Sequence, residues 1–203
     1  MLPRNWPLML IAIILAIALF IFVNGCASAR LSSGEVRLSD DDNFVVAVPR
    51  DGFLFEAGMW WTAHLPERPG SAVAVTLVNG VHPAQVLVAV RSDDGRPLAQ
   101  IAEDMRRIET VGERRVSEVD ATIFGNVRRT TFSYRSSYRD SAGDRLVERF
   151  TIARSADIPG KLVEFYGAWT EDDDSRMSDD MDVMASTLQA MPPAMLESYR
   201  RSR

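Results

Sequence analysis

The feature that most constrains this 203-residue chain is an uncharged stretch near its start. No charged residue lies between Arg4 and Arg30, and Leu8 to Val23 form an unbroken apolar run, LMLIAIILAIALFIFV. Such a run is typical of a signal-peptide core or a membrane span. Its sixteen residues reach about 24 Å as a helix, short of the roughly 30 Å hydrocarbon core, so a span would need the uncharged flanks as well. The run therefore predicts that the following residues are exported or anchored.

The residues after this run favour a lipid anchor over an uncleaved single span, which stays the alternative. Val23-Asn24-Gly25-Cys26 resembles the lipobox of bacterial lipoproteins, and Cys26 is the one cysteine in the sequence. The resemblance implies cleavage between Gly25 and Cys26, a lipid on the Cys26 thiol and an acylated amino end. Several acyl chains, each contributing about 0.8 kcal/mol per buried CH₂, give stable membrane residence. Because Ala27 replaces the Asp that signals inner-membrane retention, the resemblance implies the outer membrane facing the periplasm, with the inner membrane as the alternative.

The sequence divides into a signal segment, a tether, one domain and a tail. Residues 1–25 are the predicted signal peptide, and residues 26–43 are a lipidated cysteine with a polar tether reaching roughly 21 Å. Residues 44–191 carry the patterns of one globular domain, and residues 192–203 form a basic tail. The net charge of −5 argues against a nucleic-acid partner. One cysteine and two histidines are too few for a Cys/His zinc site, so we expect neither a metal nor a cofactor.

Apolar periodicity predicts an α+β domain. In residues 85–91, apolar side chains occur at both odd- and even-numbered positions, which point to opposite faces of a strand. This pattern indicates a strand covered on both faces. Apolar spacings of 3, 4 and 3 predict a helix over residues 97–109 and a second one from Ser178, its N-cap, to Met191. Pro159-Gly160 suits the centre of a type II turn. Further strands are expected at residues 44–48, 59–65, 72–78, 127–138, 146–153 and 162–169.

The order of these elements resembles the PsbP-like fold, including bacterial lipoproteins of the DcrB type. It opens with the pattern Phe-x-Val-x-Val-Pro-x-x-Gly-Phe at Phe44 to Phe53, and the resemblance extends to about Met191. It implies an antiparallel sheet flanked by helices, an α/β/α sandwich. Members of this fold are mostly binding or assembly modules. The implied function is therefore a non-catalytic accessory role, although no functional residue carries over.

Catalytic signals in the sequence are weak. It contains no nucleophile elbow, P-loop or zinc-protease motif. His64 and His82 are its imidazoles, and each is either a general base beside a carboxylate or an ordinary solvent-facing histidine. Seven acids between Glu171 and Asp182 either stabilise a helix N-terminus or chelate Ca²⁺, although the EF-hand spacing is absent. We therefore expect no catalytic residues and no enzyme.

The adjacent Trp60 and Trp61 are the candidate partner or ligand surface. In a strand they point to opposite faces. Either helices bury both rings, or one ring lines an apolar groove or a partner patch. The resulting interpretation is a membrane-anchored periplasmic lipoprotein that binds an envelope protein as an accessory or assembly factor. Its alternatives are a carrier or sensor of a small apolar ligand, and a hydrolase.

Overall fold

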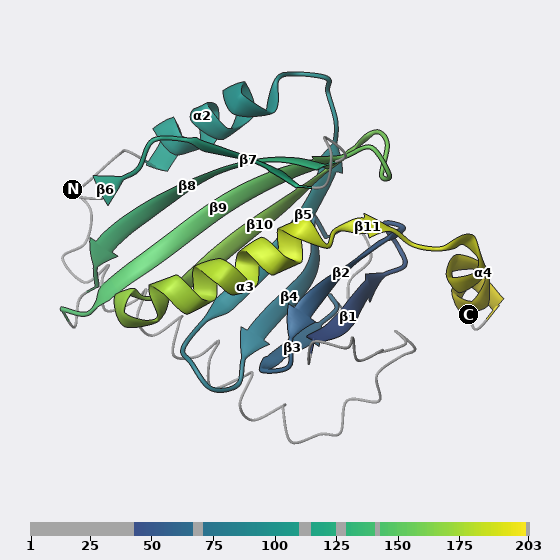
Figure 1. The fold of residues 1–203 in the computed structure, drawn as a ribbon, viewed down its shortest axis with the longest axis horizontal. Helices are drawn as coiled ribbons and strands as arrows, with labels where there is room; N and C mark the ends of the chain where they lie inside the picture. Colours follow the sequence, from purple (N-terminus) through teal and green to yellow (C-terminus); the bar gives the residue numbers. More distant parts are fainter. Residues whose placement is uncertain (1–42, 67–70, 110–114, 125–128, 141–142, 202–203) are drawn as a thin grey trace, which may run out of the picture. The chain divides into compact units, whose positions relative to one another are not determined.

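Two antiparallel sheets organise the part of the chain that the computed structural model describes (Figure 1). The described residues are 43–66, 71–109, 115–124, 129–140 and 143–201. The predicted signal peptide, the Gly25–Cys26 cleavage site and almost all of the tether lie outside them. The elements follow in the order β1 (Asn43–Val48), β2 (Phe53–Gly58), β3 (Trp61–His64), β4 (Val73–Asn79), β5 (Gln85–Ser92), α2 (Leu98–Glu109), β6 (Arg115–Val116), β7 (Asp120–Phe124), β8 (Arg129–Arg139), β9 (Arg145–Ser155), β10 (Lys161–Thr170), the 3₁₀ turn η1 (Glu171–Asp173), α3 (Asp174–Ser186), β11 (Gln189–Ala190) and α4 (Pro193–Arg201).

The larger sheet has the strand order β3-β4-β5-β10-β9-β8-β6, and β7 also pairs with β8. Its pairings are antiparallel, and Phe165 of β10 lies opposite both Val88 of β5 and Thr151 of β9. Alternate residues along these strands therefore share one face of the sheet. The smaller sheet has the order β1-β2-β11.

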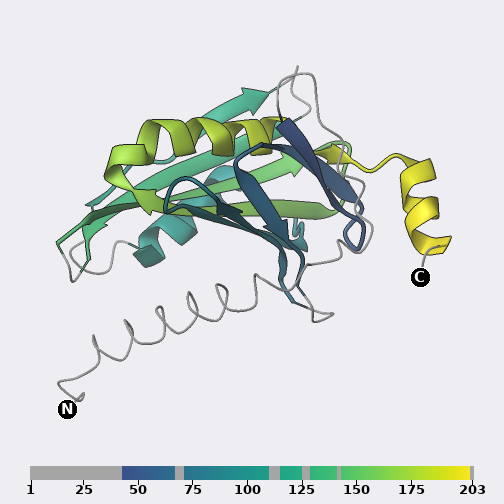
Figure 2. The ribbon, with the colours of Figure 1, turned by 90° about the horizontal axis from the view of Figure 1, so that it is seen from below.

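The main core lies between the large sheet on one side and α3 with the small sheet on the other. Figure 2 shows α3 and α2 on opposite sides of the large sheet. Val86 and Val88 of β5 and Phe165 of β10 are fully buried on the α3 side, where they pack with Met181 and Met184 of the helix. The predicted apolar stripe of this helix is thus part of the core.

A second, smaller core lies under α2. Leu98 and Ile101 of the helix pack on Tyr134, Phe150 and Ile152 of β8 and β9. Because α2 packs on β8 and β9, the α2-side residues of β5 are only half-buried. The prediction that residues 85–91 are covered on both faces is therefore wrong for this face.

The helix and turn predictions are confirmed in part. The first predicted helix is α2, shorter by one residue, and Gly160 has the positive φ of 76° that a type II turn requires at its third position. The second helix is α3, but it starts at Asp174 rather than after Ser178, because η1 leads directly into it. It ends at Ser186, where the Thr187 hydroxyl donates to the Val183 carbonyl at 2.7 Å.

The sequence prediction missed four strands and one α-helix. These are β2, β6, β7, the two-residue β11 and α4, and α4 occupies most of the segment predicted as a basic tail. Leu188 and Met191 lie beyond the end of α3 and are nevertheless buried. Among the helices in the described ranges, none has both the length and the apolar character needed to cross a bilayer.

Candidate functional site

The helix α2 covers only part of the face of the large sheet on which it packs. We call the uncovered part the open sheet face, and it consists of residues on β3, β4, β5 and β10. The register aligns Tyr166 with Leu87, and Leu87 with Thr76, so their side chains share this face. Its members are Thr62, His64, Thr76, Val78, Gln85, Leu87, Ala89, Tyr166 and Ala168, all exposed or half-buried.

A groove of about 330 Å³ runs between the open sheet face and the smaller core. Its lining includes Leu87, Tyr166, Phe150 and Tyr134, which are successive cross-strand neighbours, together with Ala168. The three aromatic rings form a continuous wall, with centroids 5.2 Å apart for Tyr134 and Phe150 and 4.9 Å apart for Phe150 and Tyr166. Apolar walls around a concave space are typical of small-molecule sites.

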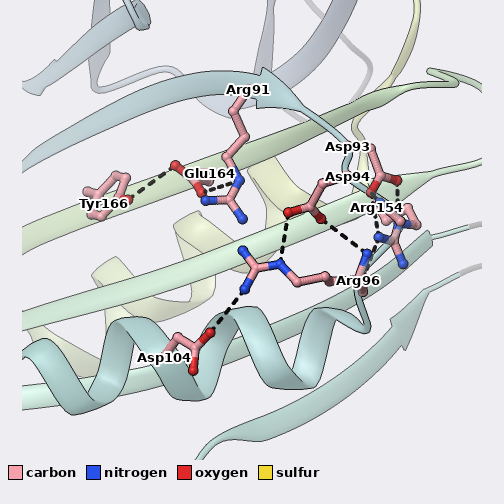
Figure 3. Close-up of polar contacts among 9 residues, drawn as sticks. Arg91, Asp93, Asp94, Arg96, Asp104, Arg154, Glu164 and Tyr166 are labelled. Carbon is pink, nitrogen blue, oxygen red and sulfur yellow. Dashed lines mark hydrogen bonds and ion pairs between the residues drawn. The ribbon is translucent and has the colours of Figure 1, made fainter.

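A buried carboxylate, Glu164 of β10, contacts the groove residue Tyr166 (Figure 3). The Tyr166 hydroxyl, from the groove wall, donates to Glu164 Oε2 at 3.2 Å. On the other side, Arg91 Nε of β5 lies 3.2 Å from Glu164 Oε1. Arg91 Nη2 is buried and has no hydrogen-bond partner in the described part of the chain, and the buried Glu164 Oε1 has its ion pair with Arg91 Nε but no hydrogen bond there. Buried polar atoms of this kind are candidates for contact with a bound molecule.

The loop between β5 and α2 fixes the helix over its half of the sheet. Arg154 of β9 donates from Nε and Nη2 to both carboxylate oxygens of Asp93, at 2.7 and 2.6 Å (Figure 3). Hydrogen bonds from Arg154 and from the Gly95 amide lower the pKa of Asp93. Arg96 bridges the loop to the helix, because it pairs with Asp94 at 2.8 Å and with Asp104 at 3.1 Å. These contacts hold α2 above β8 and β9.

The two histidines are not brought together. His82, in the β4–β5 loop, has its Nδ1 2.7 Å from Asp173 Oδ1, and its Nε2 lies 2.8 Å from Arg176 Nη1. Because a guanidinium only donates, Nε2 accepts and Nδ1 carries the proton. Both nitrogens therefore join this loop to η1 and α3. His64 is exposed at the opposite end of β3.

The acidic side chains around the start of α3 contact different partners instead of forming one cluster. Asp174 and Asp180 accept hydrogen bonds from the buried indoles of Trp169 and Trp61, at 3.0 and 2.7 Å. Asp174 also pairs with Arg135, and further pairs join Glu171 to Arg145, Asp173 to His82, and Asp182 to Arg149. Within the described ranges, no three His, Cys, Asp or Glu side chains are grouped so as to hold a metal ion. The described acids thus connect α3 to the sheet and the adjacent loop.

Comparisons with known proteins identify the fold. No protein-family model matches the sequence, and no curated protein sequence matches it. Among solved structures, cyanobacterial PsbP (CyanoP) from Synechocystis sp. PCC 6803 is similar, with a TM-score of 0.54 and 14% identity over 79% of this chain and 98% of that chain. The chain has the PsbP-like fold.

Two further structures share features of this PsbP-like domain. LpqN, involved in cell envelope biogenesis of Mycobacterium tuberculosis, has a TM-score of 0.52 and 13% identity, over 78% of this chain and 90% of that one. The Ran-binding protein Mog1p of Saccharomyces cerevisiae has a TM-score of 0.49 and 11% identity, over 75% and 97%. The similarity to CyanoP confirms the fold predicted from the order of strands and helices.

The two tryptophans of the predicted partner surface have different environments in the PsbP-like domain. Trp61 is the first residue of β3 and is 3% exposed, whereas Trp60 lies in the preceding turn and is 56% exposed. Trp61 is therefore a core residue, and a contact of Trp60 with a partner stays a prediction. Cys26 and the lipobox lie outside the described residues. The groove and the Arg91–Glu164 pair were not predicted, although the isolated acid in the apolar strand KLVEFYGAW was a signal for them.

Proposed function

We propose that this chain is an envelope-associated accessory protein whose PsbP-like domain binds a protein partner through the open sheet face. The observation that carries the proposal is the incomplete helix cover of the large sheet, which leaves Val78, Leu87 and Ala89 half-buried beside polar groups. Apolar side chains in a contiguous patch with a polar surround mark interaction sites. The similarity to LpqN, which is involved in cell envelope biogenesis, supports a role of this kind.

A lipid on Cys26 is the anchor in this proposal. The lipobox resemblance of Val23-Asn24-Gly25-Cys26 supports it, and it implies the outer membrane, with the inner membrane as the alternative. Intact mass spectrometry of the chain extracted from its own membranes checks it. We expect a chain that begins at Cys26 and carries acyl mass. Cys26→Ala is expected to block processing, and normal cleavage of this variant would refute the lipoprotein.

The partner proposal is tested by placing a photo-crosslinking residue on the open sheet face in intact cells. We expect positions 76 and 87 to give the same protein adduct, because Thr76 and Leu87 are cross-strand neighbours. Position 108 is the matched control, since Ile108 on α2 is 68% exposed and lies outside this face. Val78→Arg should abolish the adduct without changing the melting temperature. Equal adducts at positions 87 and 108 would contradict the proposal.

A small apolar ligand in the groove is the second candidate function. The specific observation is the aromatic-walled space of about 330 Å³, whose lining residue Tyr166 is hydrogen-bonded to Glu164. Such a site suits a mostly apolar molecule with one hydrogen-bonding group. Native mass spectrometry in mild detergent checks it. A low-mass adduct on the wild type that disappears in Ala168→Trp, which fills the groove from an exposed position, would favour this candidate over the protein partner.

A further inference from the structure

Three large apolar side chains are exposed together at one end of the domain. Met59, Trp60 and Val81 are 52%, 56% and 58% exposed, and we call them the apolar tip. Met59 and Trp60 belong to the β2–β3 turn, and Val81 to the β4–β5 loop. The Gly80 amide donates to the Trp60 carbonyl at 2.8 Å, so the two loops lie side by side. The tip lies at strand ends and is separate from the open sheet face.

Hydrogen bonds hold both loops of the apolar tip in place. Asn79 Oδ1 accepts from the amides of Val81 and His82, each at 2.9 Å. His82 is in turn paired with Asp173 at 2.7 Å. Trp61, next to Trp60, donates to Asp180 Oδ2 at 2.7 Å and is buried. The exposed side chains are therefore presented by an ordered scaffold, which reduces the entropy cost of binding.

The polypeptide reaches the domain beside the apolar tip. β1 begins at Asn43, and Asn43 pairs with Gly58 of β2, which directly precedes Met59. The 42 residues before β1 include the apolar run Leu8–Val23 and the candidate lipidation site Cys26. The polar composition of residues 26–43 predicts a tether with a reach of roughly 21 Å. An anchor in this segment would keep the tip close to the membrane surface.

We propose that the apolar tip inserts into the interfacial layer of the lipid bilayer that holds the amino-terminal anchor. The inference rests on the anchor of the proposed function, and it adds a second contact with the same membrane. Tryptophan favours the headgroup region, because its ring is apolar and its N–H is polar. Tethering gives the tip a high local concentration at the surface, so a small apolar contact suffices.

The charges nearest the tip indicate that the contact is apolar rather than electrostatic. Asp173 and Asp180 are used in the contacts with His82 and Trp61, and the one cation in this group, Arg176, contacts His82 Nε2 at 2.8 Å. One cation beside two carboxylates gives no net attraction for anionic lipid headgroups. We therefore expect insertion into zwitterionic phosphatidylcholine, and we expect it to persist at high salt because screening does not weaken apolar contacts.

Quenching of tryptophan fluorescence by lipid tests the proposal on the full chain. The Trp6→Phe variant is reconstituted into phosphatidylcholine vesicles with plain or brominated acyl chains. Its remaining indoles are Trp60, Trp61 and Trp169, and the last two are 3% and 1% exposed. Bromine quenches by contact, so quenching is expected and should come from Trp60. Adding Trp60→Phe should remove the quenchable fraction.

A relocated indole is the matched control. Ile108 is 68% exposed on α2, which packs on β8 and β9, whereas the tip flanks β3 at the other edge of the sheet. In the Trp6→Phe, Trp60→Phe background, Ile108→Trp should show no quenching by brominated lipid. Equal quenching at positions 60 and 108 would overturn the proposal, since it would show that the domain contacts the lipid without a preferred orientation.

Vesicle flotation separates failure of the anchor from failure of the tip. A chain that does not float with the vesicles contradicts both the anchor and the tip contact. A chain that floats but shows no bromine quenching of Trp60 contradicts the tip contact alone, and would assign the tip to a protein partner or a second copy. Loss of quenching in 1 M salt, where the Debye length is about 3 Å, would contradict apolar insertion.

Discussion

At the scale of single residues, Gly167 of β10 is a position where the core leaves no room for a side chain. A Cβ atom there would overlap Cζ3 of Trp169, lie 2.8 Å from Cη2 of the same ring and lie 3.0 Å from Met181 Sδ. The ring cannot move easily, because it is 1% exposed and its Nε1 donates to Asp174 Oδ1 at 3.0 Å. Gly167 is therefore required for Trp169 to pack under α3.

We expect Gly167→Ala to lower the free energy of unfolding by about 1–3 kcal/mol, the usual effect of overpacking a core. Urea denaturation followed by fluorescence measures the change. Ala168→Ser is the neighbouring control, since Ala168 is exposed on the opposite face, and it should stay within about 0.5 kcal/mol of the wild type. Equal effects of the two variants would show that the contact with Trp169 is not the cause.

The hydrogen bond between Trp61 and Asp180 gives a second residue-scale prediction. Asp180→Leu leaves the buried Trp61 Nε1 without its acceptor, which is 2.7 Å away in the native protein. We expect a loss of about 1–3 kcal/mol in the free energy of unfolding, the usual cost of an unsatisfied buried donor. Asp180→Asn keeps an acceptor and should lose less. Asp179→Leu, one residue away and exposed, is the control, and a loss as large as that of Asp180→Leu would refute the assignment.

At the scale of helices and strands, periodicity predicts the elements with one solvated face. The α2 stripe identifies its helix to within one residue, because its spacing and the preceding Pro97 agree. Periodicity does not predict β2, because Phe53, Leu54 and Phe55 are all buried and show no alternation. It also predicts that α3 continues to Met191, because the buried residues after Ser186 continue the apolar spacing although the helix has ended.

The candidate site is less predictable than the elements that build it. Leu87 and Tyr166 of the groove are cross-strand neighbours that lie far apart in the sequence. A strand pattern shows that each belongs to a sheet face, but not that α2 leaves this face uncovered. That outcome depends on the contacts of the β5–α2 loop, such as Asp93 with Arg154, which no local pattern encodes. Pairs of this kind need the tertiary structure.

The surface ion pairs of α2 give a pH-dependent prediction. Hydrogen bonds from Arg106, with a smaller contribution from Arg107, lower the pKa of Glu103 from 4.5 to about 2. Because the folded-state pKa lies below the ordinary value, the stabilisation is complete above pH 4.5 and is lost as the pH falls through about 2. Glu103→Gln should therefore lower the melting temperature by less than about 2 °C at pH 7, since the pair is on the surface.

The difference in melting temperature between Glu103→Gln and the wild type should shrink between pH 4.5 and pH 2. Scanning calorimetry at several pH values measures it. Arg107→Gln is a weaker variant for comparison, because the hydrogen bond from Arg107 to Glu103 is 3.1 Å long, whereas those from Arg106 to Glu103 are 2.6 and 2.7 Å long. A difference that grows as the pH falls would have the wrong sign and would refute the assignment.

At the scale of the whole domain, the two cores lie on opposite faces of the same strands. On β9, Ile152 belongs to the α2 core and the adjacent Ala153 to the α3 core. On β10, Leu162 and Phe165 are divided in the same way. Neither core can open without exposing strands that the other uses. The sheet therefore couples α2 to α3, and the two layers should unfold as one cooperative unit.

Hydrogen exchange measured by mass spectrometry tests this coupling. We expect Ile152→Ala, which removes about 2–5 kcal/mol from the α2 core, to reduce amide protection in α2 and α3 alike. Leu196→Asp is the contrasting variant, because α4 packs through Met195 and Leu196 on a separate small cluster around Leu54. It should speed exchange in α4 and leave β9 and β10 protected. If Ile152→Ala released α2 while α3 kept its protection, the two layers would be independent and the shared-strand argument would fail.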